Sequence, residues 1–499
     1  MHIAFFNPQG NFDNKDSYWI EHPDFGGQLV YVKELAKALD RKGHQTVIFT
    51  RRIDDPDWPE FSQMEEIYDG TNVRIVRIDF GGPQFLSKEA LWTHLAEYAD
   101  GIRQWYRNEG KNPDLVTSHY GDGGIAGALF HRDTGIPFTF TAHSLGAHKL
   151  EKLLDSGVEF KQLDQQYQFS VRIAAERTAM RLAMLRVVST DQERTHQYHH
   201  PLYRDLFQEE ALTPFVTIPP GVNQSIFHTT FTSKDEDVAM LLHQSMKRYI
   251  MDQRQALPLV IVSSRLEPEK NVTGLVRAFG ESRILQEKCN LLLVIRGIED
   301  PFNDSGKYKG VERKQFVQIR EQIRENKLLG KVAFINVPNQ RSLAAIYRLV
   351  ALQGGVFCLP SLYEPFGLAT IEAMGSGLPV VVSSNGGGRE ILNNGESFCG
   401  MLINPEETSS IVRGILTMLS DTHLRKQYRE AALKKVATRY TWDAAAEMLQ
   451  NAIYQGFIHQ LDQYTNKTDI PAYFDFPSLE NLKALTWVEK AACAWMTDE

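Results

Sequence analysis

The segment E-P-F-G-L-A-T-I-E, residues 364–372, comes four residues after the apolar run G-V-F-C-L, and it leads into helix-forming residues up to two glycines, Gly375 and Gly377. A short, continuous apolar run such as residues 355–359 is typical of a buried strand in a parallel sheet. The sequence around residue 364 therefore predicts a strand, a tight loop and a helix start, which is the repeating unit of an α/β fold.

The same segment suggests a ligand. Backbone N–H groups at the predicted helix start, residues 366–368, are suited to an anion. The carboxylates of Glu364 and Glu372 are suited to accept hydrogen bonds from hydroxyl groups on either side of that anion. A diphosphate flanked by a sugar and a ribose fits this arrangement, which indicates a nucleotide sugar. Acidic residues in such units also serve as helix caps or as solvated groups, so the segment alone leaves both interpretations open.

The composition limits the class of protein. A chain of 499 residues predicts two or more domains, and 42% hydrophobic and 10% aromatic residues are typical of a globular protein with full cores. The net charge of -8 argues against a nucleic-acid partner, because such a partner requires a basic face.

The cysteines and the ends of the chain suggest a location. The four cysteines are far apart in the sequence, which predicts reduced thiols and a cytoplasmic protein. The N-terminus is expected to be a first strand and not a signal peptide. No run of 18 apolar residues is found, so no membrane partner is expected.

Strand patterns and helix patterns alternate through most of the chain, which predicts parallel sheets with helices on both faces. The Pro-Pro-Gly stretch within residues 218–223 interrupts this alternation. We expect two doubly wound, Rossmann-like domains that face each other across a deep cleft, with ligands at the carboxyl ends of the strands. Their expected bounds are residues 1–223 with the tail from about 466 to 499, and residues 224–465. The expected strands are residues 2–6, 46–49, 73–78, 115–118, 138–141, 185–189 and 215–218, then 259–263, 291–295, 332–335, 356–359, 379–382 and 401–403.

Two further strand ends in the second half carry candidate residues. Arg265 and Lys270 lie in one loop after residues 259–263. Fixed cations would stabilise a departing diphosphate, although such a pair on a loop is often only solvated. Gly386 and Gly387 precede a short helix, where glycines allow close approach of a ligand and a helix start favours an anion.

The first half offers a second group of candidates. Gly26, Gly27 and Gln28 begin the first long helical pattern, without the G-x-G-x-x-G fingerprint of dinucleotide binding. His143 follows the expected strand 138–141. No metal site is expected: the run of residues 196–200 contains three histidines, but no carboxylate or cysteine pattern accompanies it.

These motifs resemble the retaining glycosyltransferases of the GT-B fold, and within them the sucrose-phosphate synthases. The general part is S-R-x-x-x-x-K-N at 264–271 and E-P-F-G-L with a glutamate eight residues after Glu364. The narrower part lies in the first half: G-G-Q-x-x-Y-V-x-E-L-A at 26–36, K-E-x-L-W at 88–92, H-Y-x-D-x-G at 119–124, T-A-H-S-L-G-x-x-K-L at 141–150 and R-I-x-A-E at 172–176.

The resemblance implies a donor site for UDP-glucose in the second half. Arg265 and Lys270 would hold the diphosphate, and Glu372 the ribose hydroxyls. Glu364 would hold the glucose and phosphates together with the backbone at Phe366, Gly367 and Leu368.

The resemblance also implies a site for fructose 6-phosphate in the first half. His143 would contact the transferring glucose. Lys88, Lys149 and Arg172 would bind the 6-phosphate, which carries about -1.5 to -2 charges at neutral pH. The rest of the pocket would be lined by Gly26, Gly27, Gln28, Tyr120 and Ser144.

The implied reaction gives sucrose 6-phosphate and UDP with retention, by a front-face route without a covalent intermediate. No cofactor is required by this scheme, and Mg²⁺ would at most assist product release. Ala147-His148 and Ser384-Asn385 depart from the pattern expected in plant enzymes, which leaves the strictness for UDP open. The alternatives are a mannosylfructose-phosphate synthase, a sucrose synthase that uses free fructose, a sugar-nucleotide epimerase and a non-catalytic nucleotide-sugar sensor.

Overall fold

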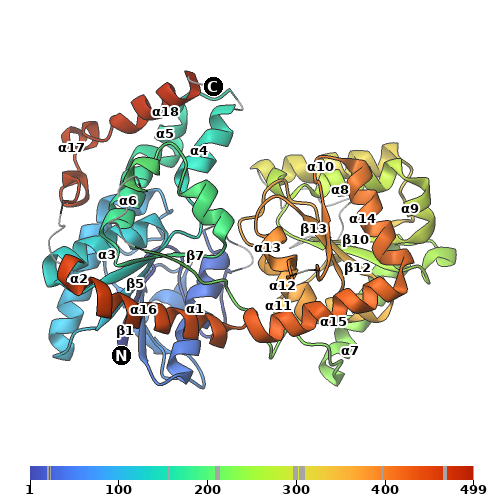
Figure 1. Ribbon diagram of the computed structural model, residues 1–499, viewed down its shortest axis with the longest axis horizontal. Helices are drawn as coiled ribbons and strands as arrows, with labels where there is room; N and C mark the ends of the chain where they lie inside the picture. Colours follow the sequence, from blue (N-terminus) through green and yellow to red (C-terminus); the bar gives the residue numbers. More distant parts are fainter. Residues whose placement is uncertain are drawn as a thin grey trace. The chain divides into compact units, whose positions relative to one another are not determined.

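A computed structural model describes residues 1–19, 22, 24–155, 157–207, 214–295, 302, 310–395, 397–464 and 469–497. The chain forms two compact units (Figure 1). Unit 1 consists of Met1–Pro219 and Ala445–Glu499, and unit 2 of Pro220–Ala444. Each unit has its own hydrophobic core and is described by itself.

Unit 1 is built on an eight-stranded sheet in the order β3-β4-β2-β1-β5-β6-β7-β8. Its strands pair in parallel, except that β3 is antiparallel to β4. The chain winds outward from β1 and then starts again at β5 on the other side of β1, so the switch point lies between these two strands. The strands are β1 (His2–Phe6), β2 (Gln45–Arg51), β3 (Glu65–Ile67), β4 (Arg74–Ile78), β5 (Leu115–His119), β6 (Phe138–Thr141), β7 (Leu185–Val188) and β8 (Phe215–Thr217).

Unit 2 repeats the plan with a six-stranded parallel sheet in the order β11-β10-β9-β12-β13-β14. Here the switch point lies between β9 and β12. The strands are β9 (Leu259–Ser263), β10 (Asn290–Ile295), β11 (Val332–Asn336), β12 (Val356–Leu359), β13 (Val380–Ser383) and β14 (Met401–Ile403). Two doubly wound parallel sheets confirm the predicted fold class.

The helices that position candidate residues follow particular strands. In unit 1 they are α1 (Gly27–Arg41), α3 (Tyr120–Thr134), α4 (Gly146–Asp155) and α6 (Phe169–Leu182). In unit 2 they are the short η7 (Pro268–Lys270), α12 (Leu368–Gly375) and α13 (Gly388–Leu392). Each begins beyond the carboxyl end of a strand, so its first residues lie at the edge of the sheet where ligands bind.

The predicted return of the chain near residue 466 differs from the structure, in which residues from Ala445 onward belong to unit 1. The physical reason is helix α16 (Trp442–Tyr464), which begins at the end of unit 2 and continues without a break. Its apolar side chains at Ala445, Ala446, Leu449 and Ile453 are buried, and its Gln450 contacts His44 at 3.0 Å. No proline or glycine interrupts the sequence between residues 442 and 455. The sequence therefore gives no local sign that the chain passes from unit 2 to unit 1 at this point.

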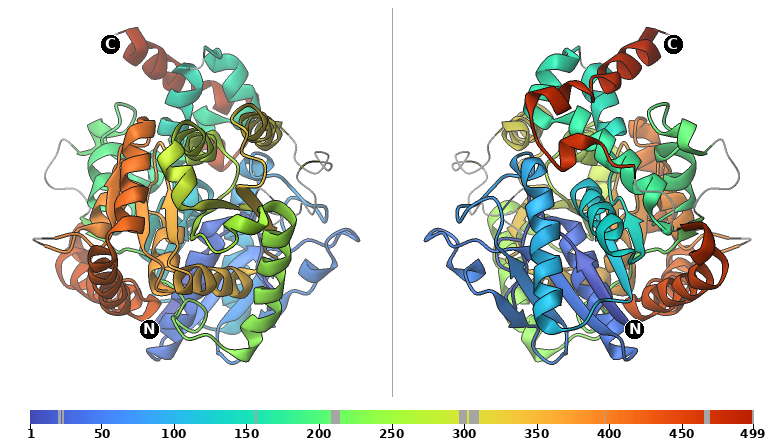
Figure 2. Two further views of the ribbon diagram at one scale, coloured as in Figure 1. Left: turned by 90° about the vertical axis from the view of Figure 1, so that its right-hand side faces the viewer. Right: turned by 90° about the vertical axis from the view of Figure 1, so that its left-hand side faces the viewer.

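The C-terminal residues pack on unit 1 as expected (Figure 2). Tyr473, Phe474, Val488 and Ala492 are buried in its core, and α18 (Trp487–Thr497) lies against α6. Among the described residues, no helix has both the length and the hydropathy needed to span a membrane.

Candidate functional site

In unit 2, the loops after β9 and β12 meet because these strands are neighbours at the switch point. The amide of Leu362 donates to the carbonyl oxygen of Glu269 at 2.8 Å, which ties the loops together. Across this contact, Lys270 Nζ lies 2.8 Å from Glu364 Oε2. The topology therefore brings together two predicted residues that are 94 positions apart in the sequence.

The Lys270–Glu364 ion pair is largely buried, with side chains only 20% and 14% exposed. Ser361 Oγ donates to the same carboxylate oxygen at 3.1 Å. Lys270 is held by the turn η7, which ends at Asn271 in the left-handed conformation with a φ of 51°. A bound diphosphate would compete with Glu364 for this ammonium group, because both are anionic partners for one cation.

Arg265 lies in the same loop and differs in its surroundings. Its side chain is 54% exposed and forms an ion pair of 3.0 Å with Glu267. Beside it, Ser264 Oγ is buried without a hydrogen-bond partner among the described residues. An exposed cation next to an unsatisfied hydroxyl group is an arrangement that a phosphate can complete.

The predicted anion-binding turn is formed by Phe366, Gly367 and the first residue of α12, Leu368. Gly367 caps the helix with a φ of 108°, a conformation that strongly favours glycine. The ring of Phe366 is anchored on Tyr440 at 5.9 Å. Glu372 lies on the same helix and is half-buried. The strand–loop–helix unit predicted from the sequence is confirmed.

Gly386 and Gly387 pack closely against the loop that carries Glu364, and their part in binding the donor stays a prediction. A Cβ atom on Gly386 would lie 2.0 Å from the carbonyl oxygen of Glu364, and one on Gly387 would lie 2.5 Å from that of Phe366. The amide of Gly387 also donates to Glu364 O at 2.8 Å. The space left by these two glycines is therefore filled by the loop that carries Glu364, and the glycines position that loop.

We expect Gly386→Ala to lower the free energy of unfolding of unit 2 by about 3 kcal/mol or more, from the clash and the strained backbone together. The matched control is Gly395→Ala, because Gly395 has a similar positive φ of 81° but a Cβ there meets nothing within 4 Å. The control should lose stability only through backbone strain, by about 1–2 kcal/mol. Urea unfolding followed by circular dichroism measures both, and equal losses would contradict the packing argument.

In unit 1, the loop after β1 ends at the start of α1. Gly26 caps the helix and Gly27 is its first residue. Gln28 is 6% exposed, and its Nε2 atom has no hydrogen-bond partner among the described residues. A buried amide donor without a partner is costly unless a ligand satisfies it, so Gln28 is suited to hold a hydroxyl group.

His143 lies beyond the end of β6 and has a φ of 56°, in the left-handed region. Its Nε2 atom is 3.0 Å from Nδ1 of His119, the last residue of β5, and the rings of Tyr31 and Tyr120 lie 5.0 and 5.6 Å away. His119 Nε2 is in turn 3.0 Å from Thr117 Oγ1. His143 is therefore oriented by a chain of polar contacts from inside the sheet.

Burial lowers the pKa of His143 to about 3, and burial together with His143 lowers the pKa of His119 well below its usual value. Both rings are therefore neutral at pH 7, so His143 can donate or accept a hydrogen bond but does not supply a positive charge.

This neutrality predicts a pH dependence. The unfolded chain protonates both rings below a pKa of 6.5, while the folded chain does not. Stability is thus fully present above pH 6.5 and is lost as the pH falls, by about 1.4 kcal/mol per pH unit for each ring. Urea unfolding of unit 1 between pH 7 and 5 can be followed by tryptophan fluorescence, since every tryptophan except Trp442 lies in that unit. His143→Gln should reduce the slope by one ring's share, and an unchanged slope would contradict the assignment.

Arg172, on α6, is fixed by a buried acidic residue. Its Nε atom donates to Glu176 Oε1 at 2.8 Å, and its Nη2 atom donates to the carbonyl oxygen and the hydroxyl group of Ser144 at 2.9 and 3.3 Å. Burial lowers the pKa of Arg172, but the charge of Glu176 and their hydrogen bond outweigh it, so the pKa is raised overall. Glu176 also accepts from the amide of Gly146 and from the hydroxyl group of Tyr203.

The other two predicted phosphate ligands have separate surroundings. Lys88 is 39% exposed and lies 3.6 Å from Asp24. Lys149, on α4 three residues after Gly146, places its ammonium group 4.1 Å from the ring centre of Tyr167. Burial raises the pKa of Asp122 to about 7. The positive charge of Arg172 lowers this pKa, and the negative charge of Asp24 raises it. Arg172 and Asp24, the ion-pair partner of Lys88, therefore both lie within electrostatic reach of the Asp122 carboxyl group.

Three residues of this half-site were not assigned a role from the sequence: His119, Asp122 and Glu176. All three occur inside the motifs H-Y-x-D-x-G and R-I-x-A-E, so the motifs contained the signal. His119 acts through His143, which is 24 residues away and is brought near only by the fold. Glu176 pairs with Arg172 four residues before it, a helical spacing that the sequence already contains. In the described part of the chain, no group of three or more His, Cys, Asp or Glu side chains could hold a metal ion.

Comparisons with known proteins match both units. A family model described as glycosyl transferases group 1 matches residues 250–435, and one described as glycosyl transferase 4-like domain matches residues 26–198. A probable sucrose-phosphate synthase of Thermosipho melanesiensis is 44% identical over 91% of this chain and 96% of its own length. The sucrose-phosphate synthase of Zea mays is 31% identical over 89% of this chain, which spans 46% of that longer protein.

Solved structures show the same fold. The sucrose-phosphate synthase of Thermosynechococcus elongatus has a TM-score of 0.68 at 23% identity, covering 92% of this chain and 99% of its own. Anabaena HepE in complex with UDP and glucose has a TM-score of 0.61 at 17% identity, covering 91% and 99%. These similarities support the GT-B arrangement of two parallel-sheet units.

Proposed function

Since the chain belongs to the sucrose-phosphate synthases, glycosyltransferases that form sucrose phosphate, we propose that it transfers glucose from UDP-glucose to fructose 6-phosphate with retention of the anomeric configuration. Unit 2 holds the donor and unit 1 the acceptor. The products are sucrose 6-phosphate and UDP.

The donor assignment is supported by the group at the switch point of unit 2. Lys270 and Arg265 provide two positive charges for the diphosphate, and the start of α12 provides backbone donors. As the bond to the leaving phosphate breaks, its negative charge rises, and fixed cations stabilise this transition state more than the ground state. Glu364, released from Lys270 by the diphosphate, can accept hydrogen bonds from the sugar.

The single observation that carries the acceptor assignment is Arg172, a largely buried cation whose orientation is fixed by Glu176 and Ser144. One neutralising carboxylate leaves further guanidinium donors for a second anion. The orphaned amide of Gln28 supplies a donor for a sugar hydroxyl. A ligand with both a phosphate and hydroxyl groups satisfies these two features, whereas free fructose satisfies only one.

A front-face route accounts for retention without a carboxylate nucleophile. The leaving phosphate oxygen takes the proton of the acceptor hydroxyl while the new glycosidic bond forms on the same face of the glucose. The neutral ring of His143 can hold a hydroxyl group of the transferring sugar. This route depends on positioning and charge stabilisation, and it requires no metal ion.

The test is to incubate the protein with UDP-glucose and with either fructose 6-phosphate or fructose, and to measure UDP and the disaccharide. Nuclear magnetic resonance of the product establishes the anomeric configuration. Turnover of the phosphorylated acceptor with retention is expected. Turnover of free fructose alone would refute the acceptor, and faster turnover with ADP-glucose or GDP-mannose would refute the donor.

A further inference from the structure

Four of the predicted acceptor residues of unit 1, Gly26, Gly27, Gln28 and Lys88, lie after β1 and β4, and a further loop lies between these two positions at the same edge of the sheet. It follows β2, which lies between β1 and β4 in the sheet. We call residues 53–61 the β2 loop. It contains no predicted ligand residue, and an inference about its role rests on the proposed function.

The ring of Trp58, in the β2 loop, contacts aromatic rings from both the loop after β1 and the loop after β4. The ring of Trp58 lies 5.9 Å from that of Phe25, at an interplanar angle of 11°, and 4.5 Å from that of Phe85, at 13°. It also contacts the rings of Tyr18 at 4.5 Å and His22 at 5.3 Å. Phe25 directly precedes Gly26, and Phe85 lies three residues before Lys88.

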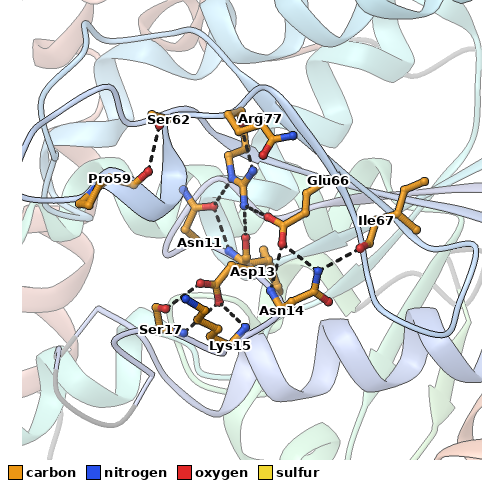
Figure 3. A network of polar contacts seen from close by, with 12 residues as sticks. Asn11, Asp13, Asn14, Lys15, Ser17, Pro59, Ser62, Glu66, Ile67 and Arg77 are labelled. Carbon is orange, nitrogen blue, oxygen red and sulfur yellow. Dashed lines mark hydrogen bonds and ion pairs between the residues drawn. The ribbon is translucent and has the colours of Figure 1, made fainter.

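The β2 loop is itself held in one conformation. The amide of Ile53 donates to Phe61 O at 3.2 Å, which closes the loop at its base. Ser62 Oγ donates to Pro59 O at 2.9 Å, just beyond Trp58 (Figure 3). The amide of Asp54 donates to Pro83 O at 2.9 Å, which fixes the segment before Phe85. The loop that carries Trp58 is therefore held in place by these hydrogen bonds.

The loop after β1 is anchored separately at its start. Figure 3 shows Arg77, from β4, and Glu66, from β3, converging on the segment 11–17. Arg77 donates to Asn11 Oδ1 at 3.2 Å and to Phe12 O at 2.5 Å, and pairs with Glu66 at 2.8 Å. This network fixes the beginning of the loop but lies well before Gly26 in the sequence. The end of the loop has other contacts, among them the stacking of Phe25 on Trp58 and on Phe61, both at 5.9 Å and both from the β2 loop.

We propose that Trp58 is a positioning residue for the acceptor: through Phe25 and Phe85 it fixes the start of α1, with Gln28, relative to Lys88. The ion pair of 3.6 Å between Asp24 and Lys88 joins the same two segments, but Lys88 is 39% exposed, so water weakens that link. Phosphate and hydroxyl contacts of one small ligand require both segments at a defined separation, and the stacked rings set it.

The test compares Trp58→Ala, Trp58→Phe and a control, Trp487→Ala. Trp487 is another half-buried tryptophan of unit 1, in the C-terminal helix α18 and stacked with Arg177 at 5.1 Å. For Trp58→Ala we expect the KM for fructose 6-phosphate to rise about 10-fold or more, with the KM for UDP-glucose and the rate of donor hydrolysis within about 3-fold of the wild type. Trp58→Phe should restore most of the acceptor affinity, because a planar ring can still stack.

A purely structural role of Trp58 would change the two KM values in a different way. Equal changes in the two KM values, or the same acceptor effect in Trp487→Ala, would overturn the proposal. Hydrogen–deuterium exchange gives a measure that needs no substrate. In Trp58→Ala, exchange should rise in both segments 24–28 and 85–88, and an increase in only one of them, or in neither, would also overturn it.

The proposed function can fail separately. If the wild type does not use fructose 6-phosphate, the assignment of the acceptor is wrong. The exchange experiment, together with calorimetric binding of other hexose phosphates to the wild type and to Trp58→Ala, then decides the role of Trp58. Weaker binding in the variant than in Trp487→Ala supports positioning, and equal binding refutes it.

Discussion

Replacing Arg265 with alanine is expected to lower kcat on the order of 10³-fold, which is the largest effect expected of a single substitution in this chain. The reason is that a cation facing the leaving diphosphate acts most strongly in the transition state, when the charge of the phosphate is highest. Arg265 is 54% exposed, and its ion-pair partner among the described residues is Glu267 at 3.0 Å. Its removal should therefore change the free energy of unfolding by less than about 0.5 kcal/mol.

The matched control is Arg283→Ala. Arg283 is also exposed and lies in unit 2, at the start of α9 (Arg283–Lys288), which precedes the amino end of β10 and not the carboxyl end of a strand. It should leave kcat unchanged. Steady-state kinetics with UDP-glucose and fructose 6-phosphate measure both variants. A loss confined to the KM for the donor, with kcat retained, would show that Arg265 binds the ground state and the transition state equally.

Lys270 provides an informative contrast with Arg265. Its ammonium group is largely buried against Glu364, so alanine there would leave a carboxylate without its charge partner in addition to removing a cation from the diphosphate. Activity and stability would fall together, and the two effects could not be separated. For this reason the exposed arginine is the better test of the chemistry.

The strands and the α/β plan could be predicted because parallel strands buried on both faces are continuous apolar runs. β12 and β13, with the sequences VFCL and VVVS, are examples. The missed strand, β3, has the sequence EEI and lies at the edge of its sheet. An edge strand exposes one side to solvent, so its charged residues give no apolar pattern.

The sequence was sufficient to predict which types of residue lie at the strand ends of the site, but not which of these residues contact each other. Nothing local in the sequence indicates that Lys270 pairs with Glu364, or that the Cβ atom missing from Gly386 leaves room for the loop of Glu364. Both facts follow from the order of strands in the sheet, which depends on packing across the whole unit. Glu176 is a different case, because Arg172 lies four residues before it on the same helix, so the spacing alone could have indicated this pair.

Replacing Lys149 with alanine is expected to change the choice of acceptor. We expect kcat/KM for fructose 6-phosphate to fall about 100-fold, while the value for free fructose and the rate of donor hydrolysis stay within about 3-fold of the wild type. Lys149 lies near the start of α4, on the turn after Gly146, whose amide is bonded to the partner of Arg172. Its ammonium group lies 4.1 Å from the ring centre of Tyr167, which restricts where the charge can be placed.

Lys152→Ala is the control for this experiment, because Lys152 lies three residues further along α4 and is exposed. It should leave the preference for the phosphorylated acceptor intact. Comparing the two acceptors distinguishes recognition of the phosphate charge from misfolding of the pocket, since a misfolded pocket would impair turnover of both acceptors. An equal loss with fructose and fructose 6-phosphate would therefore exclude Lys149 as a phosphate ligand, and Arg172, held by its own buried carboxylate, would then have to bind the phosphate without it.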